Sequence, residues 1–164
     1  MKRATRVKKI NLAKLKKEVW QLVSIAIRLR DADVHGQVTC ISCNYTGYYI
    51  RDKIQAGHFF QSRNFQGVRW NFDNIHGQCQ FCNGGRQGNV YRYYTKLKEK
   101  IGQNRIDKLN NNADEKIKET IDFILEVKAM AIKIIAKNAK EKNIYDWKQL
   151  ITKKEINSWP VNLT

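Results

Sequence analysis

Four cysteines carry the strongest chemical signal in the sequence, and they form two Cys-x-x-Cys pairs. Two residues between thiolates let both sulfurs reach one tetrahedral ion, and two such pairs complete a four-thiolate site. The spacing predicts a structural zinc ion, because four protein ligands leave no open position for a substrate. Unrelated cysteines and a redox dithiol are the alternatives, although a redox dithiol would need only one pair. The predicted ligands are Cys40, Cys43, Cys79 and Cys82.

A lone histidine, His58, lies between the two pairs in the segment Gly57-His58-Phe59. Binding of both pairs to one ion would close the intervening chain into a compact loop and bring His58 near the residues after Cys82. A neutral histidine can take a proton from water near pH 7, so His58 is a candidate general base. Taken alone, a histidine in a strand is more often a structural hydrogen-bonding residue.

Amide side chains surround the second cysteine pair, at Asn74, Asn83 and Asn89. Amide and carboxylate oxygens are the ligands that Mg²⁺ and Mn²⁺ prefer. Such an ion can stabilise a phosphodiester that water attacks, and also the leaving oxygen. One histidine, an amide ligand and nearby cations therefore predict a one-metal nuclease.

The 164-residue chain has a formal net charge of +16, which indicates a polyanionic partner. Nucleic acid is the simplest such partner. The alternatives are a ribosomal-type or merely soluble basic protein and an anionic membrane surface, which is less favoured because no helix has a membrane-facing aromatic stripe. Phosphate contacts are expected from Arg63, Arg69 and Arg86, although each alone is equally well explained as a solvated surface cation.

Apolar residues recur at helical spacing on both sides of the cysteine region. They predict helices over 11–30, with Asn11 as the N-cap, over 90–101 and over 113–139, with short helical pieces near 106–109 and 145–151. High strand propensity at 48–50 and 54–60 predicts a short, irregular β-hairpin.

These elements predict an α+β fold of single-domain length. We expect a basic N-terminal arm and helix at 1–36, a four-cysteine core at 37–102 and a C-terminal helical region at 103–164. Core packing is the favoured fate of Trp20, and of three aromatics that could otherwise stack on unpaired bases. These three are Tyr48, Tyr49 and Trp70.

His58, Asn74 and Asn83 are spaced like the three positions of the HNH motif, also called the ββα-metal or His-Me finger nuclease motif. In many such domains one Cys-x-x-Cys pair precedes the motif and a second lies just before its last position, as Cys79 and Cys82 lie before Asn83. The resemblance implies a zinc-stapled ββα-metal nuclease core with long flanking helices.

The segment AGHF…RWNFDNIHGQCQFCN…GN…Y is similar to one particular family, the phage recombination proteins called NinG or Rap. The similarity covers about residues 25–110. It implies a structure-specific DNA endonuclease that cuts branched recombination intermediates, such as Holliday junctions or D-loops.

The resemblance assigns a role to each matching residue. His58 would be the general base that activates water, and Asn74 would fix a loop through backbone hydrogen bonds. Asn83 would ligate the catalytic metal, and Asn89, which matches the family's Gly-Asn pair, would lie by the metal or a phosphate.

Gly57 departs from the HNH pattern, since many such enzymes place an aspartate or a histidine directly before the base, where it binds the metal. Either His58 is itself the metal ligand and another group is the base, or a second ligand comes from elsewhere. Asp52, Asp73 and His76 are the candidates for that ligand. The alternative for His76 is a hydrogen-bonding role beside the cysteines.

We therefore expect a DNA endonuclease with structural Zn²⁺ and catalytic Mg²⁺ or Mn²⁺. Symmetric cleavage of a four-way junction would need a homodimer, with the helices at 11–30 and 113–139 as the expected contact surfaces. No transmembrane helix or signal peptide is expected, which indicates the cytoplasm, that of the host cell if a phage encodes the chain. The alternatives are a less selective HNH nicking or restriction-type endonuclease and a non-catalytic zinc-knuckle DNA-binding module.

Overall fold

The structure is a computed structural model that describes residues 10–151. The predicted basic arm at 1–9 and the tail at 152–164 lie outside the described residues. The helices are α1 (Leu12–Asp31), α2 (Val90–Ile101), α3 (Gln103–Asn112) and α4 (Ile121–Lys142). The strands are β1 (Gln37–Thr39), β2 (Thr46–Tyr48), β3 (Ile54–His58) and β4 (Ile75–Cys79). The short helical segments are η1 (Gln66–Val68), η2 (Phe72–Asn74), the π-helix η3 (Phe81–Gly85) and η4 (Asp146–Leu150).

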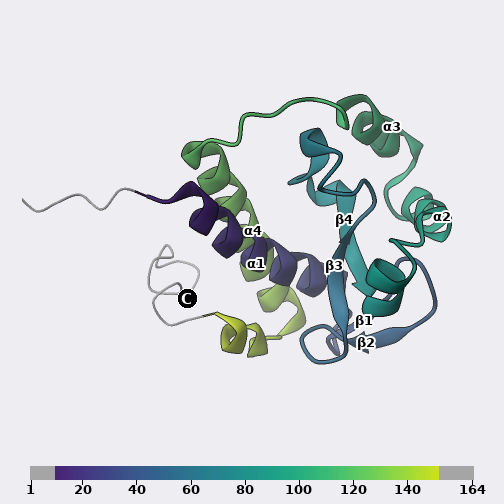
Figure 1. Cartoon of the computed structure of the whole chain (residues 1–164). Helices are drawn as coiled ribbons and strands as arrows, with labels where there is room; N and C mark the ends of the chain where they lie inside the picture. The colour runs from purple at the N-terminus through teal and green to yellow at the C-terminus, as the bar shows by residue number, and fades with distance from the viewer. Residues whose placement is uncertain (1–9, 152–164) are drawn as a thin grey trace, which may run out of the picture.

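Helix α1 begins where the sequence predicts, because Asn11 Oδ1 accepts a hydrogen bond from Lys14 N at 3.1 Å and caps the first turn. Its buried residues, including Val19, Val23 and Ala26, recur at helical spacing and pack against α4. The two helices lie side by side (Figure 1). The apolar faces that we expected to form a dimer surface therefore cover one another within one chain.

The β-structure consists of two separate antiparallel pairs, β1 with β2 and β3 with β4. The predicted hairpin between 48–50 and 54–60 is wrong, because β3 pairs across the sequence with β4 and not with the preceding segment. The preceding segment pairs instead with β1, where Tyr48 lies opposite Gln37, and Asp52 Oδ2 accepts the Tyr48 N–H at 2.7 Å in the turn that follows. The β3–β4 register places His58 opposite Ile75 and Gly57 opposite His76.

The C-terminal helices also differ from the prediction. Helix α3 continues through the asparagine run to Asn112, since Ile106 and Leu109 bury one of its faces. Residues 113–120 form a linker that arches over the molecule (Figure 1), and Thr120 caps α4 by accepting from Phe123 N at 3.2 Å. Helix α4 runs to Lys142, past the predicted end, because Lys142 Nζ donates to three carbonyl groups at the end of α1.

One main core joins the N-terminal helix, all four strands and α4, and it includes Val23, Val38, Ile75 and Ile135. The three parts of the predicted division therefore share a core, and their boundaries stay a prediction. Two smaller clusters attach α2 and α3 to the loops around β3. None of the helices within the described residues is long and apolar enough to cross a membrane.

Candidate functional site

The four cysteines meet at one point, as their spacing predicts. Their sulfur atoms all lie within 4.8 Å of one another, and Cys43 Sγ lies 3.8 Å from Cys79 Sγ. A tetrahedral ion with zinc–sulfur bonds of about 2.3 Å requires sulfurs about 3.8 Å apart. The cluster could therefore hold a structural metal such as zinc, and it would join the β1–β2 hairpin to β4 and η3.

Three N–H groups donate hydrogen bonds to the cysteine sulfur atoms. Ser42 N donates to Cys40 Sγ and Cys82 N to Cys79 Sγ, both at 3.4 Å. Asn89 Nδ2 donates to Cys82 Sγ at 3.5 Å. Such hydrogen bonds orient thiolate ligands and spread their negative charge. Asn89, which we expected beside a catalytic metal or a phosphate, is thus turned toward the cysteines instead.

His58 lines a separate hollow of about 1000 Å³. The structure brings His58 and Asn83 to this hollow, as the sequence predicts. Its wall includes Arg63 and Arg69, and two lysines and a tryptophan of α1 complete that side. We call it the His58 hollow. No carboxylate is among its lining residues within the described part of the chain.

One hydrogen bond determines which ring nitrogen of His58 carries the hydrogen. Its Nε2 lies 3.0 Å from the backbone oxygen of Arg69. A carbonyl oxygen can only accept, so Nε2 carries the hydrogen and Nδ1 keeps the lone pair. Burial lowers the pKa of the His58 imidazole below 6.5, and only the hydrogen bond to Arg69 opposes this shift. His58 is therefore neutral at pH 7, with Nδ1 available as a base.

Trp20 of α1 stacks on the His58 ring, with 5.0 Å between the ring centroids and 18° between their planes. Trp70 meets Trp20 edge-on at 6.2 Å. We expected core packing for both tryptophans; Trp70 is buried in the main core and Trp20 is half-buried against it, and both also line the His58 hollow. Helical spacing could not reveal that Trp20 stacks on His58, because spacing does not show which strand a helix covers.

Asn74 organises the loop that carries Arg69. Its side chain is fully buried, and Nδ2 donates to the backbone oxygens of Phe60 and Val68, each at 3.0 Å. Its Oδ1 accepts from Phe60 N at 2.7 Å. These are backbone hydrogen bonds of the kind that the resemblance implies. They hold the residue before Arg69, whose carbonyl orients His58.

Asn83 reaches the His58 hollow from the π-helix η3. Its Nδ2 donates to Gln55 Oε1 at 2.7 Å, a partner that sequence reasoning did not identify. No hydrogen bond to the carboxamide oxygen of Asn83 is found among residues 10–151, so this oxygen could serve as a ligand atom. His58 and Asn83 can therefore offer one nitrogen lone pair and one neutral oxygen to the same space.

The neighbouring strand explains the glycine at position 57. A Cβ atom there would lie 2.9 Å from Gln78 Cβ and would overlap Gln78 Oε1. Gln78 is fully buried, and its Nε2 donates to Ser42 Oγ and to the Gly88 carbonyl, both at 2.6 Å. The space that a metal-binding side chain would need at position 57 is thus filled by Gln78.

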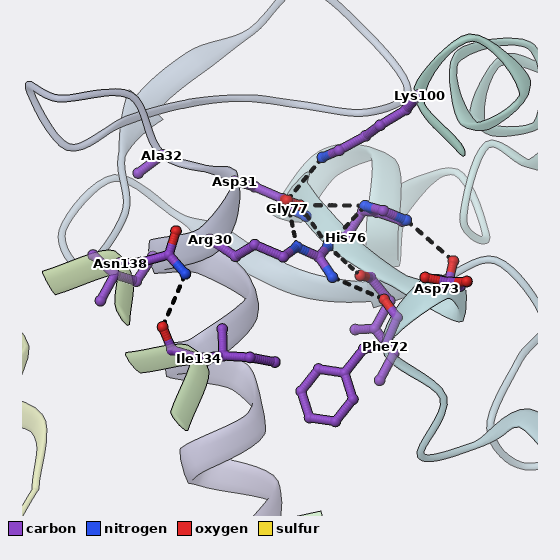
Figure 2. Close-up of polar contacts among 12 residues, drawn as sticks. Arg30, Asp31, Ala32, Phe72, Asp73, His76, Gly77, Lys100, Ile134 and Asn138 are labelled. Carbon is purple, nitrogen blue, oxygen red and sulfur yellow. Dashed lines mark hydrogen bonds and ion pairs between the residues drawn. The ribbon is translucent and has the colours of Figure 1, made fainter. Parts of the chain in front are cut away.

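His76, one candidate second ligand, is fully engaged in a buried network on another side of the strands (Figure 2). Its Nε2 donates to the Asp73 carbonyl at 3.1 Å, and its Nδ1 accepts from Arg30 Nη2 at 2.8 Å. Burial lowers the pKa of the His76 ring, which agrees with this neutral state. His76 therefore has no lone pair left for a metal.

The centre of that network is the carboxylate of Asp31. It accepts from Arg30 Nε and Gly77 N, each at 2.8 Å, and from Lys100 Nζ at 2.7 Å. Burial opposes ionisation, but the charges and hydrogen bonds of Arg30 and Lys100 hold the pKa of the Asp31 carboxyl well below its usual range. The network fastens the end of α1 to β4, the strand that pairs with β3.

The two aspartates that we considered as metal ligands are engaged elsewhere. Asp73 forms an ion pair with Arg105 of α3, and Asp52 accepts from the backbone of Tyr48. Neither lines the His58 hollow. Of the residues considered for the catalytic metal besides His58, Asn83 alone lines the His58 hollow within the described part of the chain.

The sequence of this chain is similar to those of known phage proteins. A family model described as bacteriophage lambda NinG protein matches residues 1–143. The chain belongs to the NinG family. It is 35% identical over 96 residues to the NinG protein of Escherichia phage lambda, a region that covers 58% of this chain and 44% of that protein. Over the same length it is 33% identical to the NinG protein of Salmonella phage P22, with equal coverage of both chains.

The chain thus spans less than half the length of the curated NinG relatives that it matches. No solved structure matches it. The family resemblance is therefore confirmed, whereas the HNH-like core stays a prediction. What the structure establishes is a mixed α+β fold with two small sheets, long helices and a four-cysteine cluster.

Two of the three arginines from which we expected phosphate contacts in this NinG family member line the His58 hollow. Arg63 and Arg69 line it, but Arg86 lies over the Phe81 ring at 4.8 Å from its centroid. Lys16 and Lys17 of α1 line it too, although we did not single them out. The acid-free run of cations before position 18 was the signal that could have identified them.

Proposed function

We propose that this chain is a metal-dependent endonuclease that hydrolyses phosphodiesters of branched DNA. The observation that supports it most is the neutral His58, held by the Arg69 carbonyl so that Nδ1 is the free base. It shares a cation-lined hollow with Asn83, and the net charge of +16 favours a polyanionic substrate.

In the proposed reaction, His58 Nδ1 takes a proton from a water molecule, whose oxygen forms a bond to phosphorus while the bond to the leaving oxygen breaks. Arg63 and Lys17 hold the phosphates, since no ion pair to either is found among the described residues. A bound Mg²⁺ or Mn²⁺, held by Asn83 Oδ1, would supply positive charge to the phosphate and the leaving oxygen.

The preference for branched DNA is carried by the family resemblance. Symmetric cleavage of a four-way junction needs two active sites, so the proposal includes a homodimer. Because α1 and α4 cover each other's apolar faces, contact between copies would use exposed side chains, such as Leu125 and Met130 of α4.

A cleavage assay separates this proposal from its alternatives. The zinc-loaded protein would be incubated with a labelled four-way junction or with a linear duplex of the same length, with Mg²⁺ present or omitted. Omission is better than chelation, because a chelator would also compete for the cysteine-bound metal. We expect Mg²⁺-dependent cutting of the junction at least about tenfold faster than cutting of the duplex, a difference of about 1.4 kcal/mol in activation free energy.

Two results would contradict the proposal in different ways. Equal cutting of both substrates would favour a less selective endonuclease and remove the junction preference. Binding of both substrates with no Mg²⁺-dependent cutting of either would favour a non-catalytic zinc-knuckle DNA-binding module.

A further inference from the structure

A second hollow, of about 820 Å³, lies beside the cysteine cluster. It shares the π-helix η3 with the His58 hollow, since Asn83 lines the His58 hollow whereas Phe81 and Gly85 line the second. Its other walls come from the first cysteine loop and from the turn before β3, through Tyr45 and Lys53. We call it the Phe81 hollow.

Phe81 is an unusual side chain to leave in solvent. Its ring is 61% exposed, and Tyr45 across the same hollow is 44% exposed. Phe81 lies between Cys79 and Cys82, so the cysteine cluster fixes its backbone on both sides. Its place on this rigid loop presents an aromatic face to solvent at a defined position, which is a feature of binding surfaces.

Three cations lie around the Phe81 hollow. Arg51 and Lys53 line it, and Arg86 lies over the Phe81 ring. The one acidic lining residue within the described chain, Asp52, has its carboxylate bonded to Tyr48 N. Exposed aromatic rings among cations are the combination that binds unpaired nucleotides, because bases stack on the rings while the cations hold the phosphates.

We propose that the Phe81 hollow binds an unpaired or displaced strand of branched DNA, with a base stacked on Phe81 and its phosphates held by Arg51 and Lys53. This inference rests on the proposed function for its choice of DNA as the partner. A strand that crosses η3 passes from the His58 hollow to the Phe81 hollow. A linear duplex offers no unpaired base for this second contact, so the Phe81 hollow selects branched substrates.

The test measures binding and not cleavage. Fluorescence anisotropy of the zinc-loaded protein would be recorded with a labelled four-way junction that carries unpaired nucleotides at its centre, and with a linear duplex of equal length, without added Mg²⁺. We expect Phe81→Ala to weaken junction binding about tenfold and to leave duplex binding within about twofold. Phe81→Trp, which keeps an aromatic face, should restore junction binding.

The control is Tyr91→Ala, which removes an aromatic ring that is 84% exposed on α2 and lies outside both the His58 and the Phe81 hollows. It should leave both affinities unchanged. Lys53→Gln removes a cation and keeps the Lys53 carbonyl that accepts from Gln80 N, so it should reduce the salt dependence of junction binding by about one unit of slope. Zinc content and melting temperature would show that each variant is folded.

Unchanged junction binding in Phe81→Ala and Lys53→Gln would overturn the inference, as would an equal loss of junction and duplex binding. The outcome is separable from the proposed function. Junction binding that depends on Phe81, in a protein that cuts nothing, would support the Phe81 hollow and reject the nuclease. If the protein cuts junctions and Phe81→Ala changes neither binding nor cutting, the nuclease proposal would be supported and the Phe81 hollow rejected.

Discussion

At the scale of single residues, the proposed base chemistry depends on His58 and the Arg69 carbonyl. A base that keeps its lone pair at Nδ1 and has a lowered pKa is ready at neutral pH. The sequence could identify His58 through its spacing from Asn74 and Asn83. It could not identify the Arg69 carbonyl, because a backbone oxygen has no signature in residue type.

The lowered pKa of His58 predicts how cleavage depends on pH. Because burial disfavours the imidazolium, His58 stays a base at pH values below its ordinary pKa of 6.5. We expect the acid limb of a kcat/KM profile to reach half its maximum below pH 6.5. An acid limb centred above pH 6.5 would contradict the account.

The same shift predicts a direction for stability. Between pH 6.5 and the lower pKa of folded His58, the unfolded chain binds a proton at this residue that the folded chain does not. The free energy of unfolding should therefore fall as the pH drops below 6.5, and His58→Gln should reduce this fall in urea titrations. An equal fall in wild type and variant would show that His58 does not contribute to it.

Gly57 and Gln78 supply a prediction about packing. We expect Gly57→Ala to lower the free energy of unfolding by about 1–3 kcal/mol, because the added methyl group overlaps the Gln78 side chain. In a Gln78→Gly background, which removes both Oε1 and Cβ of Gln78, the same change should cost less than about 1 kcal/mol, which a double-mutant cycle in urea would measure. Gly84→Ala is the matched control, since nothing lies within 4 Å of its added Cβ. Equal costs in both backgrounds would reject the overlap.

At the scale of elements, the cysteine cluster reinforces the few hydrogen bonds that join the first cysteine loop to β4, such as Ile41 N to the Gly77 carbonyl at 2.9 Å. The β1–β2 hairpin and the β3–β4 pair form separate two-stranded sheets, which are marginal without further support. Cys40 and Cys43 follow the first sheet's opening strand, whereas Cys79 ends β4. A metal ion bound here would thus connect the two sheets.

We predict one zinc ion per chain, measured by elemental analysis, and its loss in Cys43→Ser. The variant's melting temperature should fall by about 10 °C, since a loss of ~3–4 kcal/mol shifts a chain of this size by about 3 °C per kcal/mol. Asn44→Ala, an exposed neighbour in the same loop, should keep both the zinc and the melting temperature. Full stability of Cys43→Ser without metal would contradict a structural role.

The sequence predicted elements with local signals better than elements that depend on distant partners. Asn11 and the apolar spacing that follows it define the start of α1 through contacts within one helix. The pairing of β3 with β4 depends on residues about twenty positions apart, and high strand propensity does not reveal the partner. Helix α4 extends to Lys142 because of carbonyl groups of α1, which no local pattern encodes.

At the scale of the whole molecule, both flanks contribute to the site between them. Helix α1 supplies Trp20 and the lysines of the His58 hollow, and Arg30 and Asp31 at its end hold β4 in place (Figure 2). The linker before α4 adds Glu119, which accepts from Trp70 Nε1 at 2.7 Å. The predicted division into a core with appended helices misses this, because no spacing pattern relates Trp20 to His58.

The most direct test of the central claim compares binding and cleavage of a four-way junction by His58→Ala. The matched control is His35→Ala, which removes an exposed histidine outside the His58 hollow. We expect His58→Ala to bind the junction within about twofold of wild type and to cut it about 10²–10⁴-fold more slowly with Mg²⁺, while His35→Ala cuts normally. Cleavage by His58→Ala at the wild-type rate, or at the rate of His35→Ala, would contradict the account.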